Sequence, residues 1–190
     1  MVIEYKVTTW IEIVKKTLQL CKKIKESGFS PDVLVSVLRG GATVSAILSD
    51  CLGIKNVTSV RTVLYTEVGK PDEEVKIIQP LVIDVKDKNV LVIDDVADTG
   101  KTLKVVVEHI KEKGAKEVRV ATIHLKPWSI YTPDYYIEET DKWIVYPWEY
   151  HEFSTEMIQK IKNQELSGED LERARAALEK VQKILEELVT

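Results

Sequence analysis

The stretch NVLVIDDVADTGKT, residues 89–102, decides how this chain folds. Residues 90–93 form an apolar run rich in β-branched side chains, which is typical of a strand buried on both faces. Two adjacent aspartates follow, then a short polar loop containing Gly100, and helical spacing resumes over about residues 99–113. A buried strand that passes into a helix through such a turn is the basic unit of an α/β fold.

The same alternation extends to either side of this stretch. Helical spacing is present at residues 10–26 and from Gly41 to Cys51, and short strand-like runs are present at residues 32–38, 57–65 and 118–125. We therefore predict an α/β fold with a mainly parallel sheet flanked by helices. The apolar face of the first helix is expected to consist of Trp10, Ile13, Val14, Leu18 and Cys21.

Two segments depart from the alternation. Residues 66–80 are charged and contain Gly69 and Pro71, so we expect a flexible connection long enough to act as a lid. Residues 151–190 predict a helical hairpin: one helix over 154–164, capped by Ser154 or Thr155, and a second with a narrow apolar seam from Leu171 to Leu188.

That seam suits helix-on-helix packing. The hairpin therefore packs on its own core or pairs with the same hairpin of a second subunit, and we favour a homodimer. The predicted organisation is a core over residues 1–150 and a dimerising hairpin over residues 151–190.

Composition excludes several classes of partner. The chain has 27 Lys and Arg against 31 Asp and Glu, a net charge of -4, so it carries no general basic field for nucleic acid or an anionic membrane. Glu4 and Lys6 occupy positions where a signal peptide would have its apolar region. No apolar run approaches the roughly 18 residues of a membrane span. We expect a cytoplasmic protein. Cys21 and Cys51 lack metal-site spacing and are expected to be free thiols in the core.

The chemistry of residues 94–102 indicates a ligand that carries both phosphate and hydroxyl groups. A helix N-terminus after the loop offers backbone N–H groups to phosphate, and the aspartates accept hydrogen bonds from hydroxyls. The nucleoside-triphosphate loop is the rival interpretation, because Gly100, Lys101 and Thr102 match the end of its pattern. That pattern requires glycine at position 95, where this chain has an aspartate whose charge would repel a triphosphate.

Residues 92–102, VIDDVADTGKT, resemble the 5-phosphoribosyl 1-diphosphate (PRPP) motif of the type I phosphoribosyltransferases. Arg39, Gly40 and Gly41 follow the 32–38 strand, where this family has its pyrophosphate loop. The resemblance implies the type I phosphoribosyltransferase fold. The residues it implies for PRPP binding are Arg39, Gly40, Gly41, Asp94, Asp95, Asp98, Thr99, Gly100, Lys101 and Thr102.

The resemblance also implies roles in catalysis. Asp98 would be the catalytic residue that accepts a proton from the purine. Mg²⁺ would be the cofactor, held by Asp94 and Asp95 directly or through water or the ribose hydroxyls, with Glu149 as a further candidate ligand.

A third region, from His124 to Glu149, resembles the purine-binding end of the bacterial and archaeal xanthine-guanine and hypoxanthine phosphoribosyltransferases. The resemblance implies that Lys126 donates to the exocyclic oxygen of a 6-oxopurine, that Trp143 stacks on the base and that the backbone of Ile144 reads its edge. Val145 departs from relatives that have an acid there, so the choice among guanine, xanthine and hypoxanthine stays open.

These resemblances predict a purine phosphoribosyltransferase of purine salvage. The lysine ammonium group donates and cannot accept, which favours a 6-oxopurine over adenine, although an adenine phosphoribosyltransferase on the same frame is the alternative. A PRPP-sensing regulatory protein and a purely structural assembly role are alternatives of other classes. Neither of these two accounts for Lys126 together with Trp143.

Overall fold

The computed structural model describes residues 3–66 and 73–189 and divides the chain into two compact units. The large unit comprises residues 14–140, and the small unit combines the residues up to Ile13 with those from Asp141 onward. Helix α1 (Trp10–Glu26) begins in the small unit and ends in the large one. Residues 141–150, which were predicted to belong to the core, therefore group with the hairpin.

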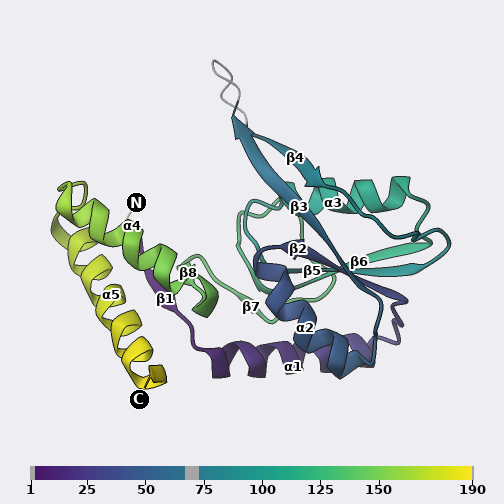
Figure 1. Cartoon of the computed structure of the whole chain (residues 1–190), viewed down its shortest axis with the longest axis horizontal. Coiled ribbons are helices and arrows are strands. Elements are labelled where there is room, and N and C mark those ends of the chain that lie inside the picture. The colour runs from purple at the N-terminus through teal and green to yellow at the C-terminus, as the bar shows by residue number, and fades with distance from the viewer. Residues whose placement is uncertain (1–2, 67–72, 190) are drawn as a thin grey trace. The chain divides into compact units, whose positions relative to one another are not determined.

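A six-stranded sheet with the order β4-β3-β2-β5-β6-β7 forms the centre of the large unit (Figure 1). Its strands are β2 (Val33–Leu38), β3 (Val57–Thr66), β4 (Glu73–Gln79), β5 (Asn89–Ala97), β6 (Glu117–Leu125) and β7 (Glu138–Glu139). Neighbouring strands are parallel except β3 and β4, which are antiparallel. The predicted α/β fold with a mainly parallel sheet is confirmed.

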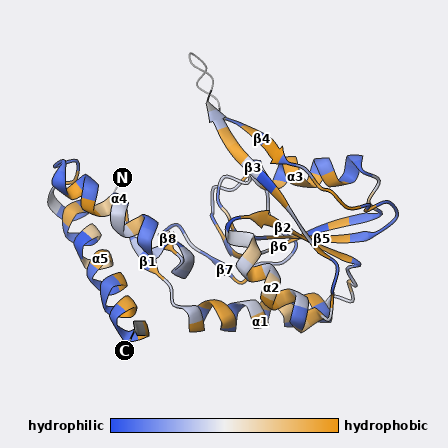
Figure 2. Cartoon of the chain, in the orientation of Figure 1, coloured by the Kyte–Doolittle hydropathy of each residue, from blue (hydrophilic) through white to orange (hydrophobic). Residues whose placement is uncertain are grey.

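The central strands β2 and β5 consist largely of buried apolar residues (Figure 2), which is typical of a parallel sheet with helices on both faces. Val90 and Val92 of β5 pack in one cluster with Leu103 and Val106 of α3 (Lys101–Glu112). Side chains alternate along a strand, so the intervening residues of β5 point to the other face, where α2 (Gly40–Leu52) packs against β2 and β5.

Helix α1 has the predicted bounds but a different buried face. Ile13, Leu20 and Ile24 are fully buried, whereas Trp10, Val14 and Leu18 are at least 39% exposed, which contradicts part of the predicted apolar face. Thr17 completes the buried stripe with no exposed surface. The spacing of apolar residues predicted the wrong face of α1, because a threonine occupies a core position while apolar residues occupy the neighbouring, exposed stripe.

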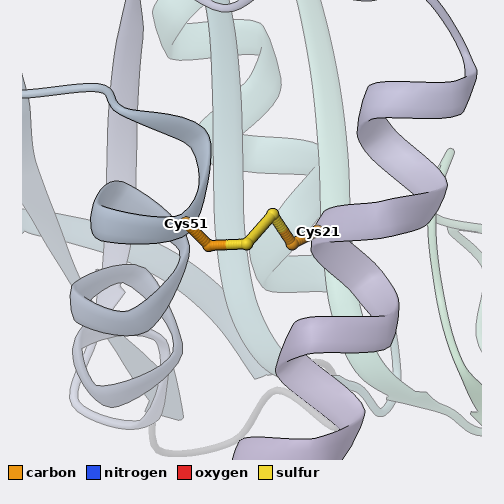
Figure 3. Close-up of a disulfide and its surroundings, with 2 residues drawn as sticks. All are labelled: Cys21 and Cys51. Carbon is orange, nitrogen blue, oxygen red and sulfur yellow. A yellow bond between two sulfur atoms is a disulfide. The ribbon is translucent and has the colours of Figure 1, made fainter.

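Cys21 of α1 and Cys51 of α2 form a disulfide across 30 residues of sequence (Figure 3). The prediction of two free core thiols is therefore wrong. Neither cysteine lies in a recognisable spacing motif, because the bond depends on α1 and α2 lying side by side in the folded unit.

Residues 73–79 also differ from the prediction, since they form strand β4 and pair with β3 rather than belonging to an irregular connection. The charged residues at these positions alternate with Val75 and Ile77, and this alternation suits a strand at the edge of a sheet. The rest of the proposed lid, residues 67–72, lies outside the described residues.

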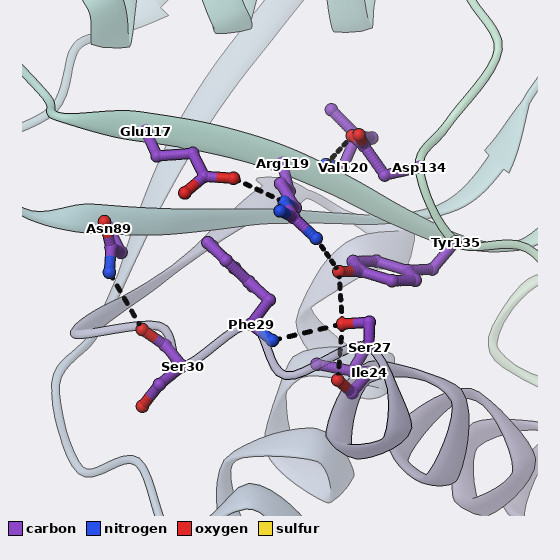
Figure 4. Close-up of polar contacts among 10 residues, drawn as sticks. All are labelled: Ile24, Ser27, Phe29, Ser30, Asn89, Glu117, Arg119, Val120, Asp134 and Tyr135. Carbon is purple, nitrogen blue, oxygen red and sulfur yellow. Dashed lines mark hydrogen bonds and ion pairs between the residues drawn. The ribbon is translucent and has the colours of Figure 1, made fainter.

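A polar network ties the end of α1 to β6 (Figure 4). Arg119 donates to Glu117 Oε1 at 2.6 Å and to the Tyr135 hydroxyl at 2.6 Å, and that hydroxyl lies 2.7 Å from Ser27 Oγ. The guanidinium also stacks over Phe29, 4.5 Å from the ring centroid. Because β6 begins at Glu117, this network braces the end of the sheet at which β6 starts.

The small unit consists of a two-stranded parallel sheet and the C-terminal helices. Its elements are β1 (Tyr5–Val7), β8 (Trp143–Val145), the 3-10 helix η1 (Pro147–Glu149), α4 (Tyr150–Lys162) and α5 (Gly168–Val189). Ser154 and Thr155 lie inside α4 and do not cap it, which contradicts the predicted start. The helical turn begun by Pro147 leads directly into α4, so the helix starts earlier than its polar residues indicated.

The hairpin seam packs within its own unit, one of the two possibilities that the sequence left open. Ala174, Leu178 and Val181 are at most 8% exposed and share a cluster with residues of β1, β8 and α4. Besides the seam, the buried members of this cluster are Val7, Val145, Tyr150, Phe153, Met157 and Ala177.

Candidate active site

The two loops singled out by the sequence lie at a topological switch point of the sheet. Strands β2 and β5 are neighbours, α2 follows β2, and α3 follows β5 on the opposite face of the sheet. In open α/β sheets this arrangement leaves a crevice at the carboxyl ends of the strands, where ligands bind. Residues 39–41 and 94–102 both lie at these ends.

Gly40 and Gly41 bring the first loop into direct contact with the end of β5. A Cβ atom on Gly40 would lie 1.9 Å from Asp95 Oδ2, and one on Gly41 would lie 2.3 Å from the carbonyl oxygen of Ile93. Only glycine fits such an approach without displacing its neighbour. Arg39 precedes α2 at its N-cap position, and the Leu38–Arg39 peptide bond is cis.

Asp94 and Asp95 form a pair of carboxylates in little solvent. Asp95 is 8% exposed; its backbone N–H donates to Asp94 Oδ1 at 3.0 Å, and its own Oδ1 accepts from the Val96 N–H at 2.8 Å. Burial, and then the neighbouring charge of Asp95, raise the pKa of Asp94 well above its ordinary value. A cation or hydroxyl donors at this pair would stabilise its ionised form.

The loop after β5 leads into the N-terminus of α3. Gly100 holds a left-handed conformation with φ +77° at the N-cap position and provides no side-chain cap. The Lys101 N–H makes a hydrogen bond of 3.4 Å to Thr99 Oγ1. The first N–H groups of a helix have no partner within the helix and carry partial positive charge, so this turn is suited to an anion such as phosphate.

A second loop, residues 126–131, packs against the loop 97–100. The Lys126 N–H donates to the Ala97 carbonyl at 3.0 Å, and the Ile130 N–H donates to the Thr99 carbonyl at 3.0 Å. A Cβ atom on Gly100 would lie 2.6 Å from the backbone nitrogen of Tyr131. Lys126, 7% exposed, is therefore placed beside the acidic loop by backbone contacts.

Asp98, the predicted proton acceptor, is exposed on the 97–100 loop and accepts a hydrogen bond from Trp128 Nε1 at 3.0 Å. Trp128 lies within the 124–149 region that resembles the purine-binding end, but the resemblance assigned it no role. The only sequence signal was an aromatic residue directly after Lys126-Pro127.

Trp143, Ile144 and Glu149 belong to the small unit, whereas Lys126 belongs to the large one, so their common purine site stays a prediction. Trp143 is 56% exposed, and its backbone N–H donates to the Glu4 carbonyl at 2.7 Å. Backbone groups alternate in direction along a strand, so those of Ile144 face away from β1. This orientation agrees with a role for the Ile144 backbone in reading a ligand.

Within residues 3–66 and 73–189, no group of three or more His, Cys, Asp and Glu side chains is arranged to hold a metal ion. An ion held mainly by substrate oxygens would need fewer protein ligands, as Mg²⁺ often does at phosphate sites. In the same part of the chain, no helix has both the length and the apolar character needed to cross a membrane.

Comparison with known proteins agrees with this geometry. The model of the phosphoribosyl transferase domain family matches residues 6–155. The solved purine phosphoribosyltransferase of Pyrococcus horikoshii is 40% identical, covers 77% of this chain and 94% of its own, and superposes with a TM-score of 0.70.

Two curated relatives agree with that match. The xanthine-guanine phosphoribosyltransferase of Gluconobacter oxydans is 25% identical over 77% of this chain and 86% of its own. The hypoxanthine-guanine phosphoribosyltransferase of Sus scrofa is 31% identical over 74% of this chain and 72% of its own. Since the family model spans both glycine-containing loops and the acidic pair between them, this chain belongs to the phosphoribosyl transferase domain family.

Proposed function

We propose that this chain is a purine phosphoribosyltransferase, a pentosyltransferase of purine salvage. It transfers the 5-phosphoribosyl group of PRPP to a 6-oxopurine, giving the nucleoside monophosphate and pyrophosphate. The C1–oxygen bond to pyrophosphate breaks, the bond from C1 to a purine nitrogen forms, and the proton on the purine leaves. The observation that carries the proposal is the meeting of two glycine-dependent loops and a pair of adjacent carboxylates, of which Asp95 is buried, at one switch point.

In this proposal the two loops hold opposite ends of PRPP. Arg39 and the backbone of Gly40 and Gly41 bind the pyrophosphate, while the N–H groups from Asp98 to Thr102 bind the 5-phosphate. Asp94 and Asp95 accept hydrogen bonds from the ribose hydroxyls. This division places charged donors at the leaving group, where negative charge develops during the reaction.

The acidic pair also suits Mg²⁺. Carboxylate oxygens are the ligands this ion prefers, and a cation would offset the repulsion between Asp94 and Asp95. When bound together with PRPP, Mg²⁺ supplies neutralising charge to the leaving pyrophosphate. Glu149 remains a candidate ligand by resemblance alone.

At the purine end, Lys126 donates to the 6-oxo group, Trp143 stacks on the ring, and the Ile144 backbone reads the edge of the base. Asp98 accepts the purine proton. The preference for 6-oxopurines rests on Lys126, since an ammonium group has no lone pair with which to accept a hydrogen bond from the amino group of adenine. The matched relatives from Gluconobacter oxydans and Sus scrofa, named for oxopurines, support the same preference.

The decisive test is incubation with PRPP, Mg²⁺ and each of adenine, hypoxanthine, guanine and xanthine, with nucleotide formation measured. We expect products from 6-oxopurines. Nucleotide formed from adenine alone would favour the adenine enzyme, whereas PRPP binding without product from any base would favour the PRPP-sensing regulator.

A homodimer in the cytoplasm and a lid are further parts of the proposal. The centre of the hairpin seam is buried in its own unit, so a dimer would use other surfaces, such as the exposed side chains of Ile158 and Leu188. Sedimentation of the full chain tests the dimer. For the lid, β3 is parallel to β2, so the last residue of β3, Thr66, lies toward the same end of the sheet as the two loops.

A further inference from the structure

We propose that Trp128 is a positioning residue for the transfer reaction. Its indole fixes the side-chain orientations of Asp98, the proton acceptor, and of Lys126, the hydrogen-bond donor to the purine. This inference rests on the proposed function. It is carried by two contacts that Trp128 makes at once, the hydrogen bond from Nε1 to Asp98 Oδ1 at 3.0 Å and the position of Lys126 Nζ 5.3 Å from its ring centroid.

The position of Trp128 is set by its loop. Backbone hydrogen bonds anchor the loop on both sides of it, from Lys126 to Ala97 and from Ile130 to Thr99, and the Ser129 N–H closes a turn on the Lys126 carbonyl at 3.0 Å. The indole therefore extends from a backbone that is already attached to the loop carrying Asp98.

The exposure of Trp128 argues against a packing role. The side chain is 52% exposed, so it buries only about half of the surface that an aromatic residue in the core would bury. Its hydrogen bond and its cation–π contact go instead to the two charged side chains assigned to the purine. A half-exposed aromatic side chain that contacts a carboxylate and an ammonium group at once has a functional rather than a core position.

The chemical consequence follows from the geometry of a carboxylate. Asp98 is exposed, so without a partner its side chain samples several rotamers. The indole N–H engages Oδ1 and orients the group, and the second oxygen then serves as the acceptor for the purine proton. The ring face, which is electron-rich, holds the Lys126 ammonium group by a cation–π contact.

Two variants separate these contacts. Trp128→Phe keeps a ring near Lys126 and removes the N–H, so we expect kcat to fall about tenfold while KM for PRPP stays unchanged, because a hydrogen bond to a charged group is worth about one order of magnitude. Trp128→Leu removes the ring as well and should also raise KM for the purine by about threefold. Trp10→Phe, in the first turn of α1, is the matched control and should retain the parental kinetic constants.

A double-mutant cycle tests whether Trp128 acts through Asp98. If it does, adding Trp128→Phe to Asp98→Asn should lower kcat no further than Asp98→Asn alone. A purely structural role predicts multiplicative losses and a lowered melting temperature, and that result would overturn the proposal.

The contact itself is testable without activity. The chain has four tryptophans, and in a ¹⁵N-labelled sample the Trp128 indole resonance is identified by its loss in Trp128→Phe. Asp98→Ala should shift that resonance and leave the other three in place; an unmoved resonance would contradict the hydrogen bond.

The outcomes distinguish this inference from the proposed function. If the parent makes nucleotide and Trp128→Phe keeps the parental kcat, only the positioning role is overturned. If the parent makes no nucleotide from any of the four bases, the transferase function fails and the role of Trp128 in it fails too, even if the resonance shifts as expected.

Discussion

The Cα atom of Gly40 lies directly against the carboxylate of Asp95, so that a Cβ atom there would sit 1.9 Å from Asp95 Oδ2. This contact joins the loop after β2 to the acidic end of β5. It links the two motifs that were separated by more than fifty residues in the sequence, and it makes the position of Asp95 depend on the absence of a side chain at residue 40.

Gly40→Ala and Gly41→Ala are expected to fail in different ways. At Gly40 the obstacle is a side chain that can rotate, so the variant should fold and lose PRPP affinity as Asp95 is displaced. At Gly41 the obstacle is the backbone carbonyl of Ile93, 2.3 Å from the new Cβ, so we expect a loss of about 1–3 kcal/mol of stability. Denaturant unfolding and PRPP titration of both variants check this; equal stabilities would contradict it.

Asp94→Asn is expected to stabilise the free protein at neutral pH. Burial and the charge of Asp95 raise the pKa of Asp94, so the folded state favours the protonated form. The stability that Asp94 contributes is full below its ordinary pKa of 3.8 and is lost as pH rises through the raised folded value. The gain in melting temperature over the parent should therefore grow from pH 4 toward neutrality.

Asp95→Asn provides the companion measurement, because it removes the charge beside Asp94. In that background, the gain in melting temperature from Asp94→Asn should grow less steeply with pH. An Asp94→Asn variant that loses stability as pH rises, relative to the parent, would show that the carboxylate is stabilised in the fold rather than strained by it.

Removal of the Cys21–Cys51 disulfide is expected to lower the free energy of unfolding by about 3–4 kcal/mol. A bond that closes a loop of 30 residues restricts the unfolded chain by an amount of this size. Reductant should lower the melting temperature of the parent and leave that of a Cys21→Ala, Cys51→Ala variant unchanged. If reductant has no effect on the parent, the bond contributes nothing to stability.

Leu178→Glu and Leu188→Glu form a matched pair in α5. Leu178 is 8% exposed and Leu188 is 59% exposed, so only the first change places a charge in the core of the small unit. We expect Leu178→Glu to cost more than about 3 kcal/mol and Leu188→Glu to cost little. Circular dichroism melting and sedimentation of both variants are the measurements. A Leu178→Glu variant that dissociates without loss of melting temperature would restore the seam as an interface between subunits.

The alternation of short apolar runs and helical spacing was enough to predict the sheet and its helices. Strand β5 and helix α1 followed from local side-chain pattern, because a fully buried strand and an amphipathic helix each impose a period on their own residues. Strand β4 did not follow, since an edge strand with exposed charged residues resembles a connection until its partner β3 is known.

The fold class could be predicted from the amino-acid sequence, because a strand, a turn and a helix N-terminus are local structures specified by adjacent residues; the chemistry assigned to the two loops stays a prediction. The sequence could not predict which distant residues meet: Gly40 with Asp95, Cys21 with Cys51, and Trp128 with Asp98. Each of these contacts joins segments brought together by strand order and helix packing. Strand order and helix packing depend on the burial of apolar surface across the whole unit. They therefore leave no periodic pattern of apolar residues in the sequence of either segment.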